Sequence, residues 1–580
     1  MYKTYLILVI GFCTLQCSSK TGHKADRLPN ILLILTDDQG WGDVGFHDND
    51  VVNTPHLDQL EQESTEFTRF YVSPVCAPTR ASLLTGRYHL ATGVTWVTHR
   101  KEVMRASEVT LAEFLKASGY RTGLFGKWHN GKQYPHDPNG QGFDEFLGFK
   151  EGHLNNYFDA TLAHNQDLVA TQGYLPDVLT DSAIAFMEKE SPFFCYLAYN
   201  TPHSPFQVPS EYFLPYKDQG LDDKNAAVYG MVTNIDHNVG RLLKALLRLD
   251  KEQETLVIFL SDNGPNGHRY NGGFKGIKAH VDEGGVRVPF LMRYPTRGWN
   301  KGTKVTSMAA HIDLFPTLAE LIGIPIPDSL EIHGKSLVGA IEREEIDTSR
   351  YFFTHQVRRA FDTLPGAVRN ERYLLTLKPS DTALYDLHDD PYQQTDLSGA
   401  MPQEVTTLAR KYLDWFLEVT KKGITPELVE IGNTSTSVEF PASEVFGRTR
   451  TQFKGKEGWA NDYLVDWEDG GQASWRLMSG SSREYEVILK ASYQASSGSN
   501  LKINIGDEEL ELDITQSRVK EPVESPDRVK RGEVYEYRWP GISLGTVVIT
   551  KGVHDLALTV TNPKDLEVKS ISLKPVQNNE

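Results

Sequence analysis

Acidic and amide side chains follow two apolar runs of this sequence, directly where each run ends. Asp37 and Asp38 follow one run, and Asp262 and Asn263 follow another. If these runs are parallel strands, their carboxyl ends meet at one edge of a sheet, where ligands bind in such folds. Carboxylate and amide oxygens suit a hard cation such as calcium or magnesium rather than zinc or copper. The sequence therefore predicts a hard-cation site at this edge.

Lysine and histidine follow two further apolar runs. Lys127 and His129 come after residues 120–125, and His203 comes after residues 193–199. A lysine can hold a tetrahedral anion, and a histidine can move a proton near neutral pH. Each such residue taken alone is more often a turn or surface residue. Their joint placement after four runs favours chemistry on a tetrahedral oxyanion beside the cation.

Cys76 is the unusual cysteine of the four in the chain. Cys13 and Cys17 lie in the N-terminal segment, and Cys195 lies in an apolar run where a buried structural thiol is expected. Cys76 instead lies in a Pro-rich turn that leads into a predicted helix, whose N-terminus lowers a thiol pKa and favours anions. There is no even-numbered disulfide framework. A Cys76–Cys195 disulfide is the alternative.

The elements that must position these residues alternate between short apolar runs and helical patterns. This alternation predicts an α/β fold, with a mostly parallel central sheet flanked by helices. Short alternating strands near the C-terminus predict an antiparallel β-sandwich. The expected domains are a catalytic α/β domain at 26–345, a smaller α+β subdomain at 346–422, a linker at 423–442 and the sandwich at 443–577.

Residues 1–22 carry one lysine near the start and a short apolar run, which predicts an export signal rather than a spanning helix. Cys17 and the residues after it resemble a bacterial lipoprotein processing site, which predicts membrane attachment by lipid at Cys17. Plain secretion, with Cys17 removed, is the alternative. We therefore expect an exported protein, periplasmic or held on the bacterial outer membrane or cell surface.

The net charge of the 580-residue chain is −17, and no basic stripe interrupts it. A nucleic-acid partner is therefore not expected, because binding phosphate backbones needs clustered lysine and arginine.

The segment Cys76-Ala77-Pro78-Thr79-Arg80, followed by residues 81–87, resembles the signature of type I, formylglycine-dependent sulfatases. These are the arylsulfatases of the alkaline-phosphatase-like superfamily, and the likeness is to exported bacterial carbohydrate sulfatases. Further segments similar to that family occur in order between Leu28 and Leu397. They are 29–38, 126–129, 202–205, 261–264, Lys278 with 283–289, and 385–387 with 390–391.

This resemblance implies that a maturation enzyme oxidises Cys76 to formylglycine, whose hydrate attacks sulfur and later expels sulfate. It also implies one calcium ion at the cation site. The implied ligands are Asp37, Asp38, Asp262, Asn263 and the modified Cys76.

The remaining roles also follow from the resemblance. Lys127 and Lys278 would clamp the sulfate oxygens, and Arg80 would fix the formylglycine. His129 would act as the base that expels sulfate, and His203 as the acid that protonates the leaving oxygen. For the second lysine we choose Lys278 over nearby Lys275, because it stands five residues before Glu283 as in the family.

Two positions depart from the family pattern. Ala279 stands where glycine is usual, and Asp282 stands where an aromatic residue is usual. These departures concern the geometry of the loop and leave its charged residues in place.

Substrate recognition is less defined by the sequence. The polar and aromatic segment 148–159 resembles loops that shape the sugar pocket of carbohydrate sulfatases, so His153 and Asn155 are candidate substrate residues, with a purely structural loop as the alternative. The sandwich carries four tryptophans that could stack on sugar rings or simply form its core. They are Trp459, Trp467, Trp475 and Trp539.

The predicted function is hydrolysis of sulfate esters on a sulfated carbohydrate. One alternative is a phosphatase or phosphodiesterase of the same superfamily, although those enzymes use serine or threonine where this chain has Cys76. Another is a surface glycan-binding protein with an inactive enzyme domain.

Overall fold

The computed structural model describes residues 28–356, 360–433, 435–455, 458–459 and 461–576. The predicted signal at 1–22 and the lipid site Cys17 lie outside these residues. Within the described residues, no helix is both long and apolar enough to cross a bilayer.

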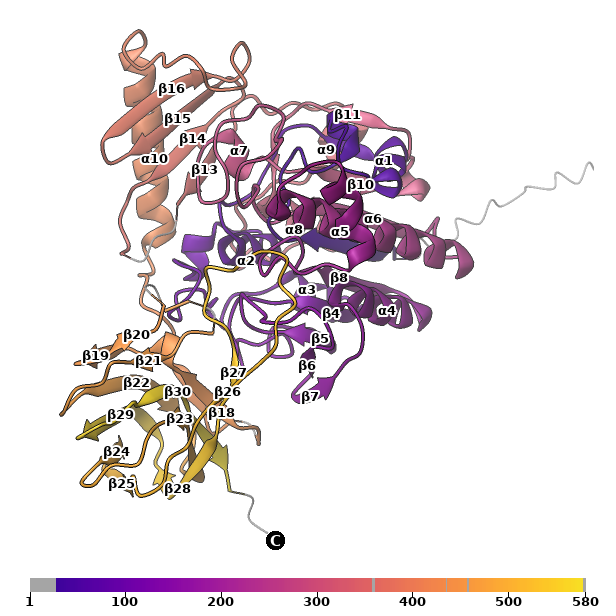
Figure 1. Ribbon diagram of the computed structural model, residues 1–580. Helices are drawn as coiled ribbons and strands as arrows, with labels where there is room; N and C mark the ends of the chain where they lie inside the picture. Colours follow the sequence, from indigo (N-terminus) through magenta and orange to yellow (C-terminus); the bar gives the residue numbers. More distant parts are fainter. Residues whose placement is uncertain (1–27, 357–359, 434, 456–457, 460, 577–580) are drawn as a thin grey trace, which may run out of the picture.

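The catalytic domain is built on one ten-stranded sheet (Figure 1). At its centre β1 (Asn30–Thr36) runs parallel to β8 (Phe193–Ala198) and β9 (Thr255–Ser261), and β4 (Arg121–Lys127) runs parallel to β8. Strands β1, β8 and β9 are almost wholly apolar, as is typical of strands buried on both faces. The predicted mostly parallel α/β sheet is confirmed.

Shorter strands extend the sheet on both sides, and several of them are antiparallel. They are β2 (Thr65–Phe67), β5 (Glu145–Phe149), β6 (Thr161–His164), β7 (Asp167–Ala170), β10 (Phe290–Arg293) and β11 (Thr303–Val305). A separate two-stranded sheet pairs β3 (Phe70–Tyr71) with β12 (Ala309–Ala310).

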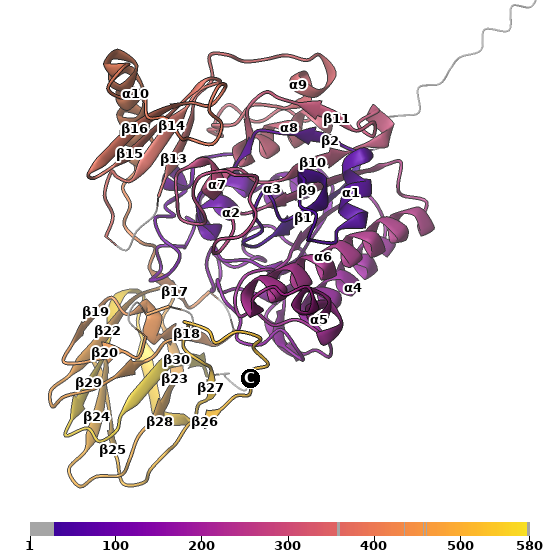
Figure 2. The same cartoon turned by 45° about the horizontal axis from the view of Figure 1, so that its top comes forward.

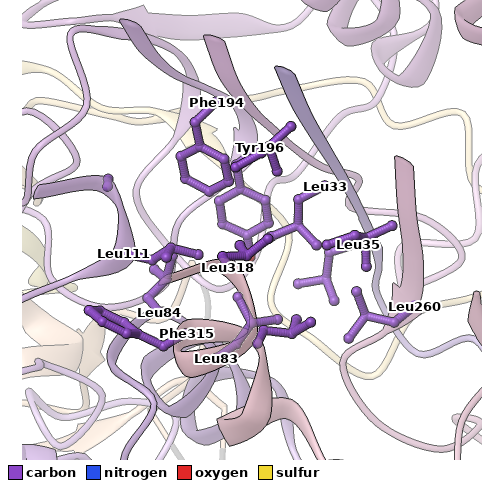
Figure 3. Packing of buried hydrophobic residues seen from close by; sticks show 14 of the residues in the cluster. Leu33, Leu35, Leu83, Leu84, Leu111, Phe194, Tyr196, Leu260, Phe315 and Leu318 are labelled. Carbon is purple, nitrogen blue, oxygen red and sulfur yellow. The ribbon is translucent and has the colours of Figure 1, made fainter. Parts of the chain in front are cut away.

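Helices cover both faces of the sheet, and successive β1 side chains alternate between them. Leu33 and Leu35 pack against α2 (Cys76–Thr85), α3 (Leu111–Ala117) and α8 (Leu314–Leu321). Figure 3 shows labelled members of this cluster from β1, α2, α3 and α8. Each fully buried leucine contributes about 1.5–3 kcal/mol relative to exposure. Two hydrophobic layers therefore hold the strands whose ends carry the polar residues.

The opposite face is covered by three other helices that bury the β1 residues between those leucines. These helices are α1 (Pro55–Gln62), α4 (Leu175–Glu188) and α6 (Asp223–Arg248). Three further helices lie in connections, namely α5 (Ser210–Asp218), α7 (Glu283–Val286) and α9 (Val338–Glu342).

A four-stranded antiparallel sheet with one helix follows the catalytic domain. Apolar residues of α10 (Pro402–Thr420) pack on this sheet, and the helix also contacts η2 (His89–Thr92). The strands of the sheet are β13 (Phe352–His355), β14 (Gly366–Arg369), β15 (Tyr373–Lys378) and β16 (Asp381–Asp386).

The C-terminal module is a sandwich of two six-stranded sheets, which Figures 1 and 2 show beside the catalytic domain. One sheet contains β17 (Val429–Ile431), β19 (Gly447–Thr449), β22 (Gln472–Ser479), β24 (Asn500–Ile505), β25 (Glu508–Asp513) and β29 (Gly552–Thr561). The other contains β18 (Val438–Pro441), β20 (Gln452–Phe453), β21 (Leu464–Val465), β23 (Arg483–Ser492), β28 (Gly541–Ile549) and β30 (Glu567–Pro575).

The predicted linker at 423–442 differs from the structure. Two strands of the sandwich, β17 and β18, lie inside this range and pair with β22 and β30. Each is only three or four residues long. Buried and less buried side chains alternate in each strand, but over too few residues to be recognised beside the Ser- and Thr-rich sequence between them.

An arm of the module, residues 521–538, reaches from the sandwich to the catalytic domain, and Figure 1 shows it as a yellow trace. Strands β26 (Glu521–Pro522) and β27 (Tyr537–Arg538) pair at its base. Arg528 donates hydrogen bonds from Nε and Nη2 to the carbonyl of Val208, at 3.1 and 2.9 Å. Asn156 donates to the carbonyl of Glu524 at 2.7 Å. The arm is thus fastened to the catalytic domain.

Candidate active site

The predicted cation ligands meet where β1 and β9 end. The backbone N–H of Asp38 donates to Oδ1 of Asp262 at 3.3 Å, and Nδ2 of Asn263 donates to Oδ1 of Asp38 at 2.8 Å. These residues and Asp37 are fully buried. Parallel pairing of β1 with β9 aligns Thr36 with Ser261, so the polar residues that follow each strand become neighbours.

Several oxygens at this edge are buried without a hydrogen-bond partner among the described residues. They are Oδ1 of Asp37, Oδ2 of Asp38 and Oδ1 of Asn263. Ligand atoms of Asp37, Cys76 and Asp262 lie within 4.8 Å of one another, as do those of Asp37, Asp38 and His203. Buried oxygens are costly unless something satisfies them. These residues therefore fit a hard cation held by oxygen ligands.

Cys76 is the first residue of α2, and every residue of this helix is buried. Burial raises the pKa of the Cys76 thiol and outweighs the opposing effects of Lys127 and Lys278. The helix N-terminus alone would have favoured a thiolate. The unmodified residue is thus a protonated thiol at neutral pH.

Arg80 lies one helical turn after Cys76 and connects the two halves of the site. Its Nη2 and Nε atoms donate to Oδ2 of Asp262 at 2.7 and 3.1 Å, and its Nη1 donates to the carbonyl of Lys127 at 2.9 Å. The guanidinium therefore holds a candidate cation ligand and the end of β4 in fixed positions relative to α2.

The two predicted sulfate-binding lysines each contact one buried aspartate. Nζ of Lys127 lies 2.6 Å from Oδ2 of Asp37, and Nζ of Lys278 lies 2.5 Å from Oδ1 of Asp38. Lys275 instead donates to the hydroxyl of Tyr385 at 2.7 Å. The structure thus brings Lys278, and not its neighbour, into the site.

His129 lies directly beside the thiol. Its Nδ1 is 3.3 Å from Sγ of Cys76, and its Nε2 is 2.9 Å from the carbonyl of Val97. A carbonyl only accepts hydrogen bonds, so Nε2 carries the proton and Nδ1 presents a lone pair to residue 76. Burial, reinforced by Lys127, puts the pKa of His129 well below its usual value. The ring is a neutral base aimed at Cys76.

Gly152 is a residue of this site that the sequence does not single out. A Cβ atom on Gly152 would lie 2.2 Å from Nε2 of His129, so only glycine lets the segment 150–154 pass this ring. His129 itself has a φ of 69°. No sequence pattern marks this close approach, which arises from the packing of two loops.

His203 lies on the other side of the candidate cation ligands. Its Nε2 is 3.8 Å from Oδ2 of Asp38, and its Nδ1 is 2.5 Å from the carbonyl of Ser204. Nδ1 therefore carries a proton, and Nε2 is the nitrogen that faces the site. Burial lowers the pKa of His203, partly opposed by Asp38.

The two candidate substrate residues occupy different places. His153 lines the cavity over Cys76, and neither of its buried ring nitrogens has a partner among the described residues. Its ring centroid is 6.2 Å from that of His203. Asn155 is not among the residues that line this cavity, because its Oδ1 accepts from Nη1 of Arg531 at 2.6 Å and from the backbone N–H of Glu536 at 3.2 Å. It joins the catalytic domain to the arm.

The cavity has a volume of about 390 Å³ and opens over Cys76, His129, His203 and Lys278. Five of its lining residues come from the C-terminal module, and no sequence motif predicts that they line this cavity. They are Ser443, Glu444, Trp459, Asn461 and Glu533. Of the four tryptophans considered as sugar platforms, Trp467 and Trp475 are buried in the sandwich core, and Trp459 is the one that lines this cavity.

Ala279, one of the two departures from the family pattern, has a φ of 67°. This left-handed conformation favours glycine, which is the residue usual at that position. The backbone N–H of Ala279 donates to the carbonyl of Pro74 at 2.8 Å, which ties this loop to the segment that precedes Cys76. Asp282, the other departure, directly precedes α7 and accepts from Nε2 of Gln393 at 3.1 Å.

The fold and this site define a hydrolase of the alkaline-phosphatase-like superfamily, with buried acidic, lysine and histidine side chains at the carboxyl ends of the central strands. The family described as sulfatase matches residues 29–324, and that described as N-sulphoglucosamine sulphohydrolase, C-terminal, matches residues 276–415. The chain belongs to the sulfatase family and is a sulfuric ester hydrolase. The prediction from the Cys76 motif is confirmed at this level.

Individual relatives agree with this assignment. The ulvan-active sulfatase of Formosa agariphila is 31% identical, over 68% of this chain and 82% of its own length. Arylsulfatase A of Homo sapiens is 31% identical, over 68% of this chain and 88% of its own length. A crystal structure of Ps i-CgsB in complex with k-i-k-neocarrahexaose superposes with a TM-score of 0.65 at 29% identity, covering 69% of this chain and 95% of that one.

Proposed function

We propose that this protein removes sulfate from a sulfated carbohydrate, using formylglycine derived from Cys76 beside a calcium ion. The observation that carries the proposal is the place of Cys76, at the start of a buried helix and 3.3 Å from Nδ1 of His129. The carbohydrate is supported by the relatives, one named as ulvan-active and another crystallised with a neocarrahexaose.

The residues that would hold calcium are Asp37, Asp38, Asp262 and Asn263, together with the modified residue 76. Their unpartnered buried oxygens support this assignment. When bound, the ion offsets the negative charge of the sulfate and orients the nucleophile. Formylglycine supplies, as its hydrate, two hydroxyl groups where an unmodified thiol has none.

The chain's own residues then bind the ester and move protons. Lys127 and Lys278 donate hydrogen bonds to the sulfate oxygens, because their ammonium groups already lie at the buried edge of the site. With Nδ1 protonated toward Ser204, His203 delivers a proton from Nε2 to the leaving sugar oxygen as an imidazolium, the charged form that the Asp38 carboxylate favours, and is left as the neutral ring. His129 accepts a proton at Nδ1 from a hydroxyl of residue 76, since its other nitrogen is committed to Val97.

The test is to express the protein with a formylglycine maturation enzyme and measure the mass of the peptide that contains residue 76. Sulfate release from a panel of sulfated sugars is then followed, with Cys76→Ala as the control. We expect conversion of Cys76 and sulfate release by the converted protein alone. Fully converted protein that hydrolyses phosphate esters but no sulfate ester would favour the phosphatase alternative.

We also propose that the protein is exported and attached by lipid at Cys17, on the basis of the sequence at 1–22. Mass analysis of the mature N-terminus in the native host tests this. A mature chain that begins beyond Cys17 and carries no lipid would contradict the attachment.

A further inference from the structure

The cavity over Cys76 has two walls from different domains. The catalytic wall contains the residues already assigned to chemistry. The opposite wall comes from the C-terminal module, and its residues lie beyond the family matches, which end at residue 415. The module therefore adds to the sulfatase site a surface that the matched family regions do not describe.

Glu533 is the arm residue that lines this cavity. Its Oε1 accepts a hydrogen bond from Oγ of Ser204 at 2.5 Å, directly beside His203. Burial would raise the pKa of Glu533, but hydrogen bonds, above all the one from Ser204, hold it below its usual value. Glu533 is thus a carboxylate that faces the part of the cavity where the leaving sugar must lie.

The arm around Glu533 is held rigidly. Arg531 donates to Oδ1 of Asn155 at 2.6 Å and to Oδ1 of Asp527 at 2.6 Å. Asp527 also accepts from Nε2 of Gln207 at 2.7 Å. These buried contacts fix the backbone near Glu533 against the loop that carries His203. The position of the Glu533 carboxylate is therefore fixed by the fold.

Two lysines that line this cavity are each paired with a carboxylate. Lys132 pairs with Glu444 at 3.0 Å, and Lys150 pairs with Asp137 at 2.9 Å. Glu533 makes no ion pair with any lysine or arginine of the described residues, and its bonded partner is the hydroxyl of Ser204. Glu533 therefore brings a negative charge, without a direct ion pair, to the space beyond the sulfate-binding lysines, and Lys224 is a cation within electrostatic range of it.

His153 adds neutral hydrogen-bonding capacity to the same space. Both ring nitrogens are buried without partners among the described residues, and burial lowers the pKa of the ring to about 3. A neutral imidazole can donate to one sugar hydroxyl and accept from another. A carboxylate accepts from hydroxyls and repels anions.

We propose that Glu533 is a specificity-determining residue, which selects a neutral hydroxylated sugar ring with a single sulfate and rejects a ring that carries a second anionic group. This inference rests on the proposed function. It assigns the C-terminal module a direct part in substrate recognition. The carboxylate accepts hydrogen bonds from ring hydroxyls and repels a second sulfate or a carboxylate placed there.

The first measurement is kcat/KM on monosulfated methyl galactosides and glucosides and on the disulfated form of each, with the formylglycine-containing protein. We expect the wild type to prefer the monosulfated sugar. Glu533→Gln keeps an acceptor for Ser204 and removes the charge, so it should shift the preference toward the disulfated sugar at least tenfold. Glu524→Gln, an exposed residue of the same arm, should leave the preference unchanged.

The second measurement is calorimetric binding of the same sugars to Cys76→Ala, which cannot turn over and so reports selection without catalysis. We expect tighter binding of the monosulfated sugar, and a reduced difference when Glu533→Gln is added. Equal or tighter binding of the disulfated sugar by Cys76→Ala would overturn the inference, as would a preference that Glu533→Gln does not move. Failure of sulfate release alone, with this binding preference intact, would count against the proposed function instead.

Discussion

Nδ1 of His129 lies 3.3 Å from Sγ of Cys76, while Nε2 of the same ring is held by the carbonyl of Val97. The lone pair on Nδ1 of the neutral imidazole therefore points toward Cys76, the residue that the family motif marks as nucleophile.

His129→Ala should therefore lower kcat by about 100-fold or more, the usual effect of removing a positioned general base. Conversion of Cys76 should be unaffected, and this is checked by peptide mass before rates are compared. His164→Ala, an exposed histidine on β6, serves as the control. A His129→Ala protein with full conversion and near wild-type kcat would contradict the assignment of the base.

The cation site predicts a link between calcium and stability. Free calcium at 100 times its Kd should stabilise the fold by about 2.7 kcal/mol. EDTA should therefore lower the melting temperature and abolish sulfate release. Calorimetric titration should show calcium binding to the wild type and to Asp50→Asn, an exposed control, but strongly weakened binding to Asp37→Asn. Unchanged binding to Asp37→Asn would remove this residue from the ligand set.

The backbone conformation of Ala279 predicts that glycine at this position would stabilise the fold. Its φ of 67° is unfavourable for alanine and free for glycine. Ala279→Gly should raise stability by up to about 1 kcal/mol, seen as a higher melting temperature. Ala117→Gly, on the exposed face at the end of α3, should instead cost up to about 1 kcal/mol. A lower melting temperature for Ala279→Gly would show that the loop does not relax this strain.

Asp236 on α6 predicts a pH effect far from the active site. Its Oδ1 accepts from the backbone N–H of Leu57 in α1 at 2.7 Å, and its buried Oδ2 has no partner among the described residues. Burial raises the pKa of Asp236 to about 7. The folded chain keeps this proton between about pH 4 and 7, whereas the unfolded chain loses it, so the residue's contribution to stability falls as pH rises through that window.

Asp236→Asn should remove this dependence while keeping the acceptor for Leu57. The melting temperature of the variant relative to wild type should rise between pH 5 and pH 8, because a tenfold difference in proton affinity between the folded and unfolded chains corresponds to about 1.4 kcal/mol. If the difference in melting temperature between the two proteins stays constant over this pH range, Asp236 is ionised in the folded chain.

The sequence predicted that the candidate cation ligands lie together, because they follow the ends of two strands. Parallel pairing of β1 with β9 places Thr36 opposite Ser261, so the residues after each strand become neighbours. The choice of Lys278 over Lys275 needed the family spacing, since nothing local distinguishes the two lysines. The state of the Cys76 thiol could not be predicted, because burial by the surrounding residues outweighs the local effect of the helix N-terminus.

The arm contacts were beyond sequence reasoning for a different reason. Glu533 meets Ser204 across more than 300 residues, and Asn155 meets Arg531 across a similar separation. Such pairings depend on how two folded domains dock, and neither partner lies in a motif that marks the contact. Strands β17 and β18 fall in the predicted linker because three or four residues are too few for a clear alternation.

The complete burial of α2 has a consequence for the order of events in the life of the protein. An ester substrate can reach residue 76 through the cavity. The maturation enzyme, however, cannot bind the segment around Cys76 once α2 has packed between the sheet and α8. On the proposed chemistry, oxidation of Cys76 must precede folding, so maturation and folding compete in time. Slower folding of α2 would then raise the fraction of molecules that carry formylglycine. A chain that folds before Cys76 is oxidised would remain permanently inactive.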